Sequence, residues 1–166
     1  INEYVANCQS FLQTAKPDND LLLYWPIHDG WAESGRTRLR HFGGHTEELT
    51  KGLSESLLAK GFLFDYISDR QIGKLTFAGG RIRAAGASYK TILVPSSRYI
   101  PLATIEKLHG LAESGATILF EEHLPGDVSG LYDLPQRQAR YDSLKQALDF
   151  RMEGRSEEHT SELQSH

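Results

Sequence analysis

The sequence predicts an α/β fold in which helices cover both faces of a doubly wound, mainly parallel sheet. Short, nearly continuous apolar runs alternate along the chain with longer segments whose apolar residues recur every three or four positions. Such runs are typical of strands that are buried on both faces, and their alternation with helices indicates right-handed crossovers. A Gly-Gly pair between two strand-like segments adds an inserted β-hairpin. Together these observations describe a flavodoxin-like domain.

The first half of the chain is expected to contain two helices, two strands and one long loop. The spacing of apolar residues in Asn2–Thr14 predicts an amphipathic helix. Leu21–Trp25 is an apolar run that predicts the first strand, and Ile27–Gly44, rich in Gly, Arg and His, predicts a loop. Thr46–Gly61 is expected to be helical because its first threonine can cap a helix with two glutamates in its first turn. Phe62–Ile67 provides the second strand.

The second half continues the alternation after a hairpin. Lys74–Arg83 predicts this hairpin because the Gly-Gly pair at its centre tolerates the positive φ of a tight turn. Thr91–Val94 and Thr117–Phe120 are the third and fourth strands, separated by a helix over Leu102–Ser114. A last helix is expected from about Gln136 to Phe150. We expect the four strands to form one parallel sheet with the first strand central.

Polar residues follow all four expected strands, where ligands bind in sheets of this kind. They are His28, Asp29 and Trp31 after the first strand, Ser68 and Asp69 after the second, Ser96, Ser97 and Arg98 after the third, and Glu121, Glu122 and His123 after the fourth. Serine and aspartate are also good turn and capping residues, so a turn or capping role is the prediction for these serines and for Asp69. Glu121 to His123 could supply an acid and a base, or metal ligands. Adjacent strand residues point to opposite faces, however, so a solvated strand end is predicted there.

Other functional motifs are weak or missing. His41 and His45 have helical spacing, but two glycines between them predict a loop, and no third zinc ligand accompanies them. We expect a solvated loop to contain Arg36, Arg38 and Arg40. We expect Cys8 to be a core residue. The sequence contains no phosphate-binding glycine loop, and neither Pro95-Ser96-Ser97 nor any cysteine provides a nucleophile elbow. The domain therefore resembles an amidotransferase-like fold without its nucleophile.

Composition excludes several classes of partner. The chain has 18 Lys and Arg against 22 Asp and Glu, a formal net charge of −4, so we expect no nucleic-acid partner. No segment approaches the roughly 18 consecutive apolar residues of a membrane-spanning helix, so we expect no membrane partner. The single Cys8 cannot form an internal disulfide and leaves the redox compartment open.

Five blocks of sequence stand out by their order and spacing. They are Asn7–Gln13, Leu22–Trp31, Phe64–Gln71, Tyr89–Pro95 and Leu111–Phe120. Each block alone is unspecific, since strand-proline and helix-glycine-strand junctions are common in α/β proteins. In this order they resemble glycoside hydrolase family 106, the α-L-rhamnosidases, over nearly all of residues 1–154.

The resemblance implies a large bacterial enzyme in which a catalytic (β/α)8 barrel precedes an amidotransferase-like α/β domain and β-sandwich modules. Residues 1–17 then form the closing helix of the upstream barrel, and residues 18–154 form the accessory domain. Residues 155–166 match a translated sequencing adapter, so we expect an artefactual, disordered tail on a metagenomic fragment. The family is expected to invert the anomeric carbon with two carboxylates about 6.5–9.5 Å apart, and to bind calcium near the sugar. None of these groups can be placed on this chain, so we expect the fragment to hold no cofactor.

The expected function is therefore a non-catalytic accessory domain that supports the barrel of the same chain and closes one wall of a pocket for a rhamnose-containing glycan. The candidates to face substrate are His28, Asp29 and Trp31, because indole offers an apolar face to a sugar ring and the other two can hydrogen-bond hydroxyls. Packing against the barrel is the alternative role for these residues. Two other functions stay open. One is the oligomerisation domain of a β-galactosidase-type enzyme, which an exposed apolar patch away from the barrel side would favour. The other is a freestanding amidotransferase-like domain that lacks the cysteine nucleophile. The location of the parent enzyme, periplasmic or secreted, also stays open.

Overall fold

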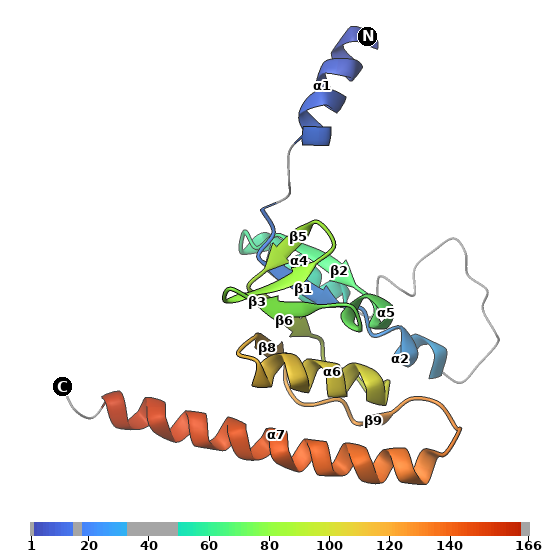
Figure 1. Cartoon of the computed structure of the whole chain (residues 1–166), viewed down its shortest axis with the longest axis vertical. Coiled ribbons are helices and arrows are strands. Elements are labelled where there is room, and N and C mark those ends of the chain that lie inside the picture. The colour runs from blue at the N-terminus through green and yellow to red at the C-terminus, as the bar shows by residue number, and fades with distance from the viewer. Residues whose placement is uncertain (1, 15–17, 33–49, 164–166) are drawn as a thin grey trace.

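Four parallel strands form the central sheet of the structure, a computed structural model that describes residues 2–14, 18–32 and 50–163 (Figure 1). The strands are β1 (Leu21–Tyr24), β2 (Phe64–Ile67), β6 (Thr91–Val94) and β8 (Thr117–Phe120), in the order β2-β1-β6-β8. Leu23 of β1 lies beside Tyr66 of β2 and Leu93 of β6. The prediction of one parallel sheet with the first strand inside it is confirmed, and the fold is a flavodoxin-like doubly wound α/β sheet.

Two smaller sheets flank the central one. The predicted hairpin is present as β3 (Thr76–Ala78) and β4 (Arg81–Ala84), and its two central glycines have φ angles of 62° and 74°. A further antiparallel strand, β5 (Ala87–Tyr89), extends this hairpin to three strands. The third sheet pairs β7 (Tyr99–Ile100) with β9 (Asp127–Val128) in parallel. The sequence did not predict β5, β7 or β9, because strands this short lack a periodic pattern of their own.

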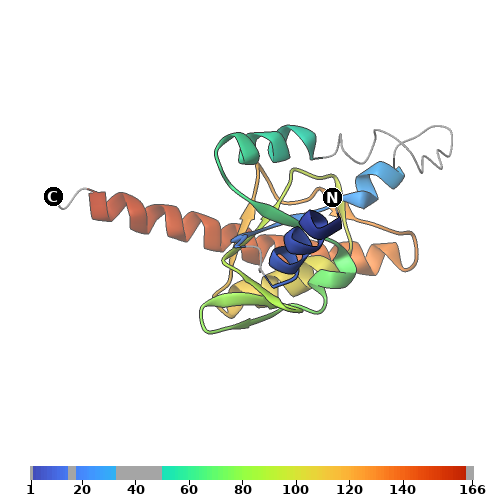
Figure 2. The same cartoon turned by 90° about the horizontal axis from the view of Figure 1, so that it is seen from above.

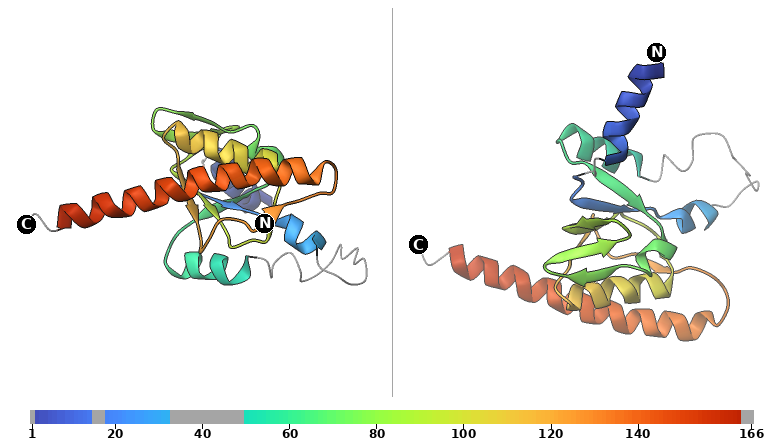
Figure 3. Two further views of the ribbon diagram at one scale, coloured as in Figure 1. Left: turned by 90° about the horizontal axis from the view of Figure 1, so that it is seen from below. Right: turned by 45° about the horizontal axis from the view of Figure 1, so that its top comes forward.

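Helices cover both faces of the central sheet. The described helices of the chain are α1 (Asn2–Thr14), α2 (Ile27–Ala32), α4 (Lys51–Ala59), α5 (Asp69–Ile72), α6 (Leu102–Glu113) and α7 (Leu134–Leu163). Figure 2 shows α4 on one side of the sheet and α6 with α7 on the other, and Figure 3 shows the same arrangement from below. The N-terminal helix α1 extends away from this body (Figure 1). Its apolar stripe is open to solvent, with Tyr4 and Leu12 about three-quarters exposed.

Several predicted boundaries differ from the structure. Ile27–Ala32, expected to begin a long loop, is the short helix α2, and residues 33–44 of that expected loop lie outside the described residues. The expected capping residue Thr46 also lies outside them, and the described helix α4 begins at Lys51. The last helix continues past Phe150 to Leu163, so the backbone of residues 155–163 is helical rather than irregular. No proline follows Phe150 in the sequence, so nothing there breaks the helix.

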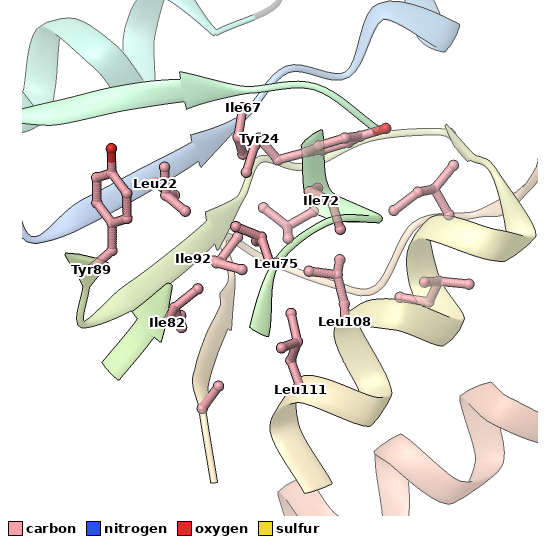
Figure 4. Packing of buried hydrophobic residues seen from close by; sticks show 14 of the residues in the cluster. Leu22, Tyr24, Ile67, Ile72, Leu75, Ile82, Tyr89, Ile92, Leu108 and Leu111 are labelled. Atoms are coloured by element: carbon pink, nitrogen blue, oxygen red, sulfur yellow. The ribbon is translucent and has the colours of Figure 1, made fainter. Parts of the chain in front are cut away.

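The hydrophobic core lies between the sheet, the hairpin and α6. Figure 4 shows Leu22 of β1 and Ile92 of β6 facing Leu108 and Leu111 of α6, with Ile82 of the hairpin closing one side. All five side chains are at most 4% exposed. Because the four strands are parallel, the carboxyl ends of β1, β2, β6 and β8 lie together at one end of the sheet, which we call the carboxyl edge.

Candidate functional site

Asp29 anchors α2 to the loop that follows β6 at the carboxyl edge. Its Oδ2 accepts a hydrogen bond from the backbone N–H of Arg98, and its Oδ1 accepts one from the N–H of Tyr99, both at 2.7 Å. Hydrogen bonds to a carboxylate are stronger than those between neutral groups. Asp29 therefore joins two segments about 70 residues apart, and both of its oxygens are engaged with the protein.

His28 and Trp31 lie together on the same short helix. Their rings meet edge to face, with centroids 5.0 Å apart and an interplanar angle of 79°. The His28 Nε2 is also 3.4 Å from the Oδ2 of Asp69. Trp31 is 72% exposed, so most of its indole remains available to another molecule. The structure thus brings the three substrate-facing candidates together on α2, with Trp31 alone pointing largely into solvent.

Asp69 of α5 connects β1 to α6 through hydrogen bonds and also lies close to His28 of α2. Its Oδ1 accepts hydrogen bonds from the hydroxyls of Tyr24 at 2.8 Å and Thr104 at 2.7 Å, and both of those residues are buried. Burial and the neighbouring carboxylate raise the pKa of Tyr24 well above its usual range, so the phenol stays a neutral donor. The preceding Ser68 caps α5, and its N–H donates to Gln71 Oε1 at 3.0 Å. The predicted capping position of Ser68 is confirmed, since it is the N-cap residue of α5, whereas Asp69 acts as a tertiary cross-link.

A second cluster joins the loops after β6 and β8. The Ser96 hydroxyl lies 3.1 Å from His123 Nε2, and the Ser96 backbone N–H donates to Glu121 Oε2 at 2.9 Å. On its other side, His123 Nδ1 lies 2.9 Å from the backbone oxygen of Leu124. The sequence predicted a turn or capping role for Ser96 and a solvated strand end for Glu121 and His123, and so missed that they meet. The available signal was that β6 and β8 both end at this edge.

Two buried polar atoms at this end of the sheet lack a hydrogen-bond partner among the described residues. They are the Oγ of Ser97, whose residue is 4% exposed, and the Nε1 of Trp25. Ser97 was predicted to serve as a turn or capping residue, yet its hydroxyl caps no backbone group within the described part of the chain.

Metal ligands and membrane spans are not found in the described part of the chain. No three His, Cys, Asp or Glu residues within it lie close enough to hold a metal ion. The pair His41 and His45, and the three loop arginines considered with it, lie outside the described residues. No described helix is long and apolar enough to cross a membrane.

A separate cavity of about 380 Å³ lies at the three-stranded hairpin sheet, away from the carboxyl edge. Arg81 and Arg83 line it together with Asp18 and Ser88. Arg81 is already paired with Asp20 at 2.7 Å, and Lys90 contacts the other oxygen of the same carboxylate at 2.5 Å. Two hydrogen bonds lower the pKa of the Asp20 carboxyl, the larger effect coming from Lys90 and the smaller from Arg81. The arrangement is a surface ion-pair network that fixes the hairpin to the segment before β1.

Comparisons with known proteins leave the family open. No family model matches the chain, and no curated protein sequence matches it. Among solved structures, it is similar to a chain described as the crystal structure of β-galactosidase from Bifidobacterium adolescentis, with a TM-score of 0.39 and 16% sequence identity. That match covers 61% of this chain and spans 39% of the other. It is a distant structural likeness to a glycoside hydrolase chain, too low in score to carry an argument about function.

Proposed function

We propose that this chain is the accessory α/β domain of a large glycoside hydrolase that releases α-L-rhamnose from glycans, and that the surface around Trp31 forms one wall of the sugar pocket. The five sequence blocks described above support the family. The observation that carries the sugar wall is the 72% exposed indole of Trp31, presented on a helix that Asp29 anchors to the carboxyl edge.

The chemistry of this surface suits a sugar. Indole stacks on the apolar face of a pyranose ring, and aromatic side chains with one open face are common in carbohydrate-sized pockets. The contact with His28 restricts the orientation of the indole, which lowers the entropy cost of ordering it on binding. Because both oxygens of Asp29 are engaged by backbone amides, its role in this proposal is to position α2 rather than to contact substrate.

Glycoside cleavage itself is assigned to the barrel that the resemblance implies. An inverting glycosidase needs one carboxylic acid and one carboxylate base on opposite sides of the scissile bond. Asp29 and Asp69 are engaged by protein hydrogen bonds, and the Glu121 carboxylate accepts from the Ser96 amide. These contacts favour structural duties for the three carboxylates.

The sugar wall can be tested on the chain itself, because it contains two tryptophans. Labelling with 5-fluorotryptophan yields two fluorine NMR signals, which Trp31→Phe assigns. We expect methyl α-L-rhamnoside to shift the Trp31 signal and leave that of Trp25, whose Nε1 is buried, unchanged. Methyl α-D-glucoside is the matched ligand control. Tyr132→Ala is the matched protein control, because it removes another exposed aromatic side chain and should leave the response of the Trp31 signal unchanged. Equal responses to both sugars, or no response at tens of millimolar, refute the sugar wall.

The accessory role has its own test. The purified chain is expected to leave an aryl α-L-rhamnoside intact, because the proposal places the catalytic carboxylates elsewhere. Hydrolysis that is lost when the chain is unfolded contradicts a non-catalytic role in glycoside cleavage.

A second candidate function, the oligomerisation domain of a β-galactosidase-type enzyme, is favoured by the apolar face that α4 leaves open. Tyr66, Leu23, Leu93 and Leu119 form one row across the sheet, since paired residues of neighbouring parallel strands share a face. The two central leucines are buried, whereas Tyr66 is 45% and Leu119 49% exposed. Exposed apolar surface of this kind marks association sites.

Light scattering distinguishes this candidate from a monomeric domain. An oligomerisation domain is expected to show a mass of at least twice 18.6 kDa, and Tyr66→Ser with Leu119→Ser should return it to the monomer. Leu131→Ser, at an apolar position outside the row that is 89% exposed, is the control. A monomer at all concentrations rules this candidate out.

A further inference from the structure

We propose that Ser96 and His123 form a nucleophile and general-base pair that cleaves small carboxylic esters. This activity goes beyond the glycosidase role proposed above and does not depend on it. The pair stands at the carboxyl edge, where α/β sheets bind their ligands. It is assembled from two loops 27 residues apart, with Ser96 Oγ 3.1 Å from His123 Nε2. This distance lies within the reach required of a serine and its base.

The tautomer of neutral His123 follows from its second contact. The backbone oxygen of Leu124 can only accept a hydrogen bond, so the Nδ1 of His123, 2.9 Å away, carries the proton. In the neutral imidazole, Nε2 is then an acceptor and faces the Ser96 hydroxyl. The carbonyl thus does for this histidine what an orienting carboxylate does in a serine hydrolase triad, since it selects the tautomer that can take a proton from serine.

The position of Ser96 is fixed from its backbone side. Its N–H donates to Glu121 Oε2 at 2.9 Å, which ties the loop after β6 to the end of β8. His123 and Glu121 are two residues apart and both contact Ser96, one at its hydroxyl and one at its amide. Glu121 is therefore a positioning residue. His123 is exposed and Ser96 half-buried, so an external ester can reach the hydroxyl.

The chemical step balances with water as the co-reactant. Ser96 Oγ forms a bond to the ester carbonyl carbon while its proton passes to His123 Nε2. When the carbon–oxygen bond to the alcohol breaks, Nε2 returns that proton to the leaving alkoxide, which leaves an acyl-serine. Water then attacks the acyl carbon with its proton taken by Nε2, and the acid departs as the proton returns to Ser96. No oxyanion donor is identified among the described residues, so we expect slow turnover of activated esters.

The test uses the full chain with p-nitrophenyl acetate as substrate and a fluorophosphonate as covalent probe. We expect hydrolysis above buffer, with mass spectrometry placing the phosphonyl adduct on Ser96. Ser96→Ala should abolish the adduct and lower hydrolysis by roughly tenfold or more. His123→Asn keeps a side-chain N–H for the Leu124 carbonyl but lacks the base, so it should lower both to a similar extent. Ser143→Ala, at an exposed serine of α7 that bonds the carbonyl of Ala139, is the matched control.

Each alternative result has a definite meaning. Hydrolysis that survives in Ser96→Ala assigns the activity to surface imidazoles and overturns the proposal. An adduct on another serine, or no hydrolysis above buffer by the folded chain, also overturns it. Circular dichroism of each variant shows whether a loss reflects unfolding. Glu121→Gln keeps an acceptor for the Ser96 amide, so it should retain the adduct, whereas Glu121→Ala should slow labelling without moving it to another residue.

Discussion

Replacing Asp69 with alanine is expected to destabilise the fold through two buried hydroxyls. The Oδ1 of Asp69 accepts from Tyr24, which is fully buried, and from Thr104, which is 4% exposed. A hydrogen bond to a charged group contributes about 1.5–3 kcal/mol, and a buried donor left unpaired costs its full desolvation. The hydroxyls lose a common partner, so Asp69→Ala should lower the free energy of unfolding by roughly 3–5 kcal/mol. At about 2–4 °C for each kcal/mol, the Tm should fall by 6 °C or more.

The variant Asp69→Asn distinguishes the loss of the hydrogen-bond acceptor from the loss of the negative charge. Both hydroxyls donate to the same oxygen, so the amide oxygen of Asp69→Asn can take its place, with the amide nitrogen directed at His28. This variant should lose only about 1 kcal/mol, for the weaker, uncharged acceptor. It also controls for the loss of a negative charge in the first turn of α5.

A double-mutant cycle supplies the decisive measurement. Urea and thermal unfolding, followed by circular dichroism, are compared for Asp69→Ala, Tyr24→Phe and the double variant. In the Tyr24→Phe background, Asp69→Ala should lower the free energy of unfolding by about 1.5 kcal/mol less than it does in the wild type. A coupling free energy below about 0.3 kcal/mol, or equal losses for the alanine and asparagine variants, refutes the cross-link.

Three further outcomes are expected. Burial, followed by the hydrogen bond to Asp65, raises the pKa of Tyr89 from 10.0 to about 12, so its contribution to stability is complete below pH 10 and is lost as the pH rises from 10 to 12. Ultraviolet titration should show this late ionisation in the wild type and not in Tyr89→Phe; a transition at the ordinary value contradicts it. Deleting residues 155–166 should leave the Tm within about 2 °C, since the described contacts of α7 with the core involve Tyr141, Leu144 and Leu148; a drop of several degrees contradicts this. Trp31→Ala should change the free energy of unfolding by less than about 0.5 kcal/mol because the side chain is mostly exposed, and a larger loss would show that it packs in the isolated domain.

The strands of the central sheet were the most predictable part of the fold. The residue ranges of β6 and β8 were predicted correctly, because each is an apolar run bounded by a clear break, such as Pro95 after β6. The helix α2 was missed because it has six residues with a glycine inside, too few for a periodic signal. Its Asp29 contacts backbone amides about 70 residues away, and a local sequence pattern carries no signal for such a contact.

The candidate site was harder to predict than the fold for the same reason. Parallel strands place their carboxyl ends at one edge, so sequence identified the right set of loops. It could not identify which side chains meet, because the contacts of Ser96 with His123 and of Asp69 with Tyr24 join residues 27 and 45 positions apart. Those pairings are decided by how the loops turn, and local propensity does not encode that geometry.

The attachment of α2 through Asp29 makes two parts of the carboxyl edge thermodynamically dependent on each other. A helix of six residues is too short to persist alone in water, so its order depends on tertiary contacts such as those of Asp29 with the amides of Arg98 and Tyr99. Any molecule that orders this loop at Ser96 lowers the entropy cost of presenting Trp31, and any molecule that orders Trp31 favours the bound form of the loop. By linkage, the two coupling free energies must be equal, so we expect occupation of either surface to change the affinity of the other.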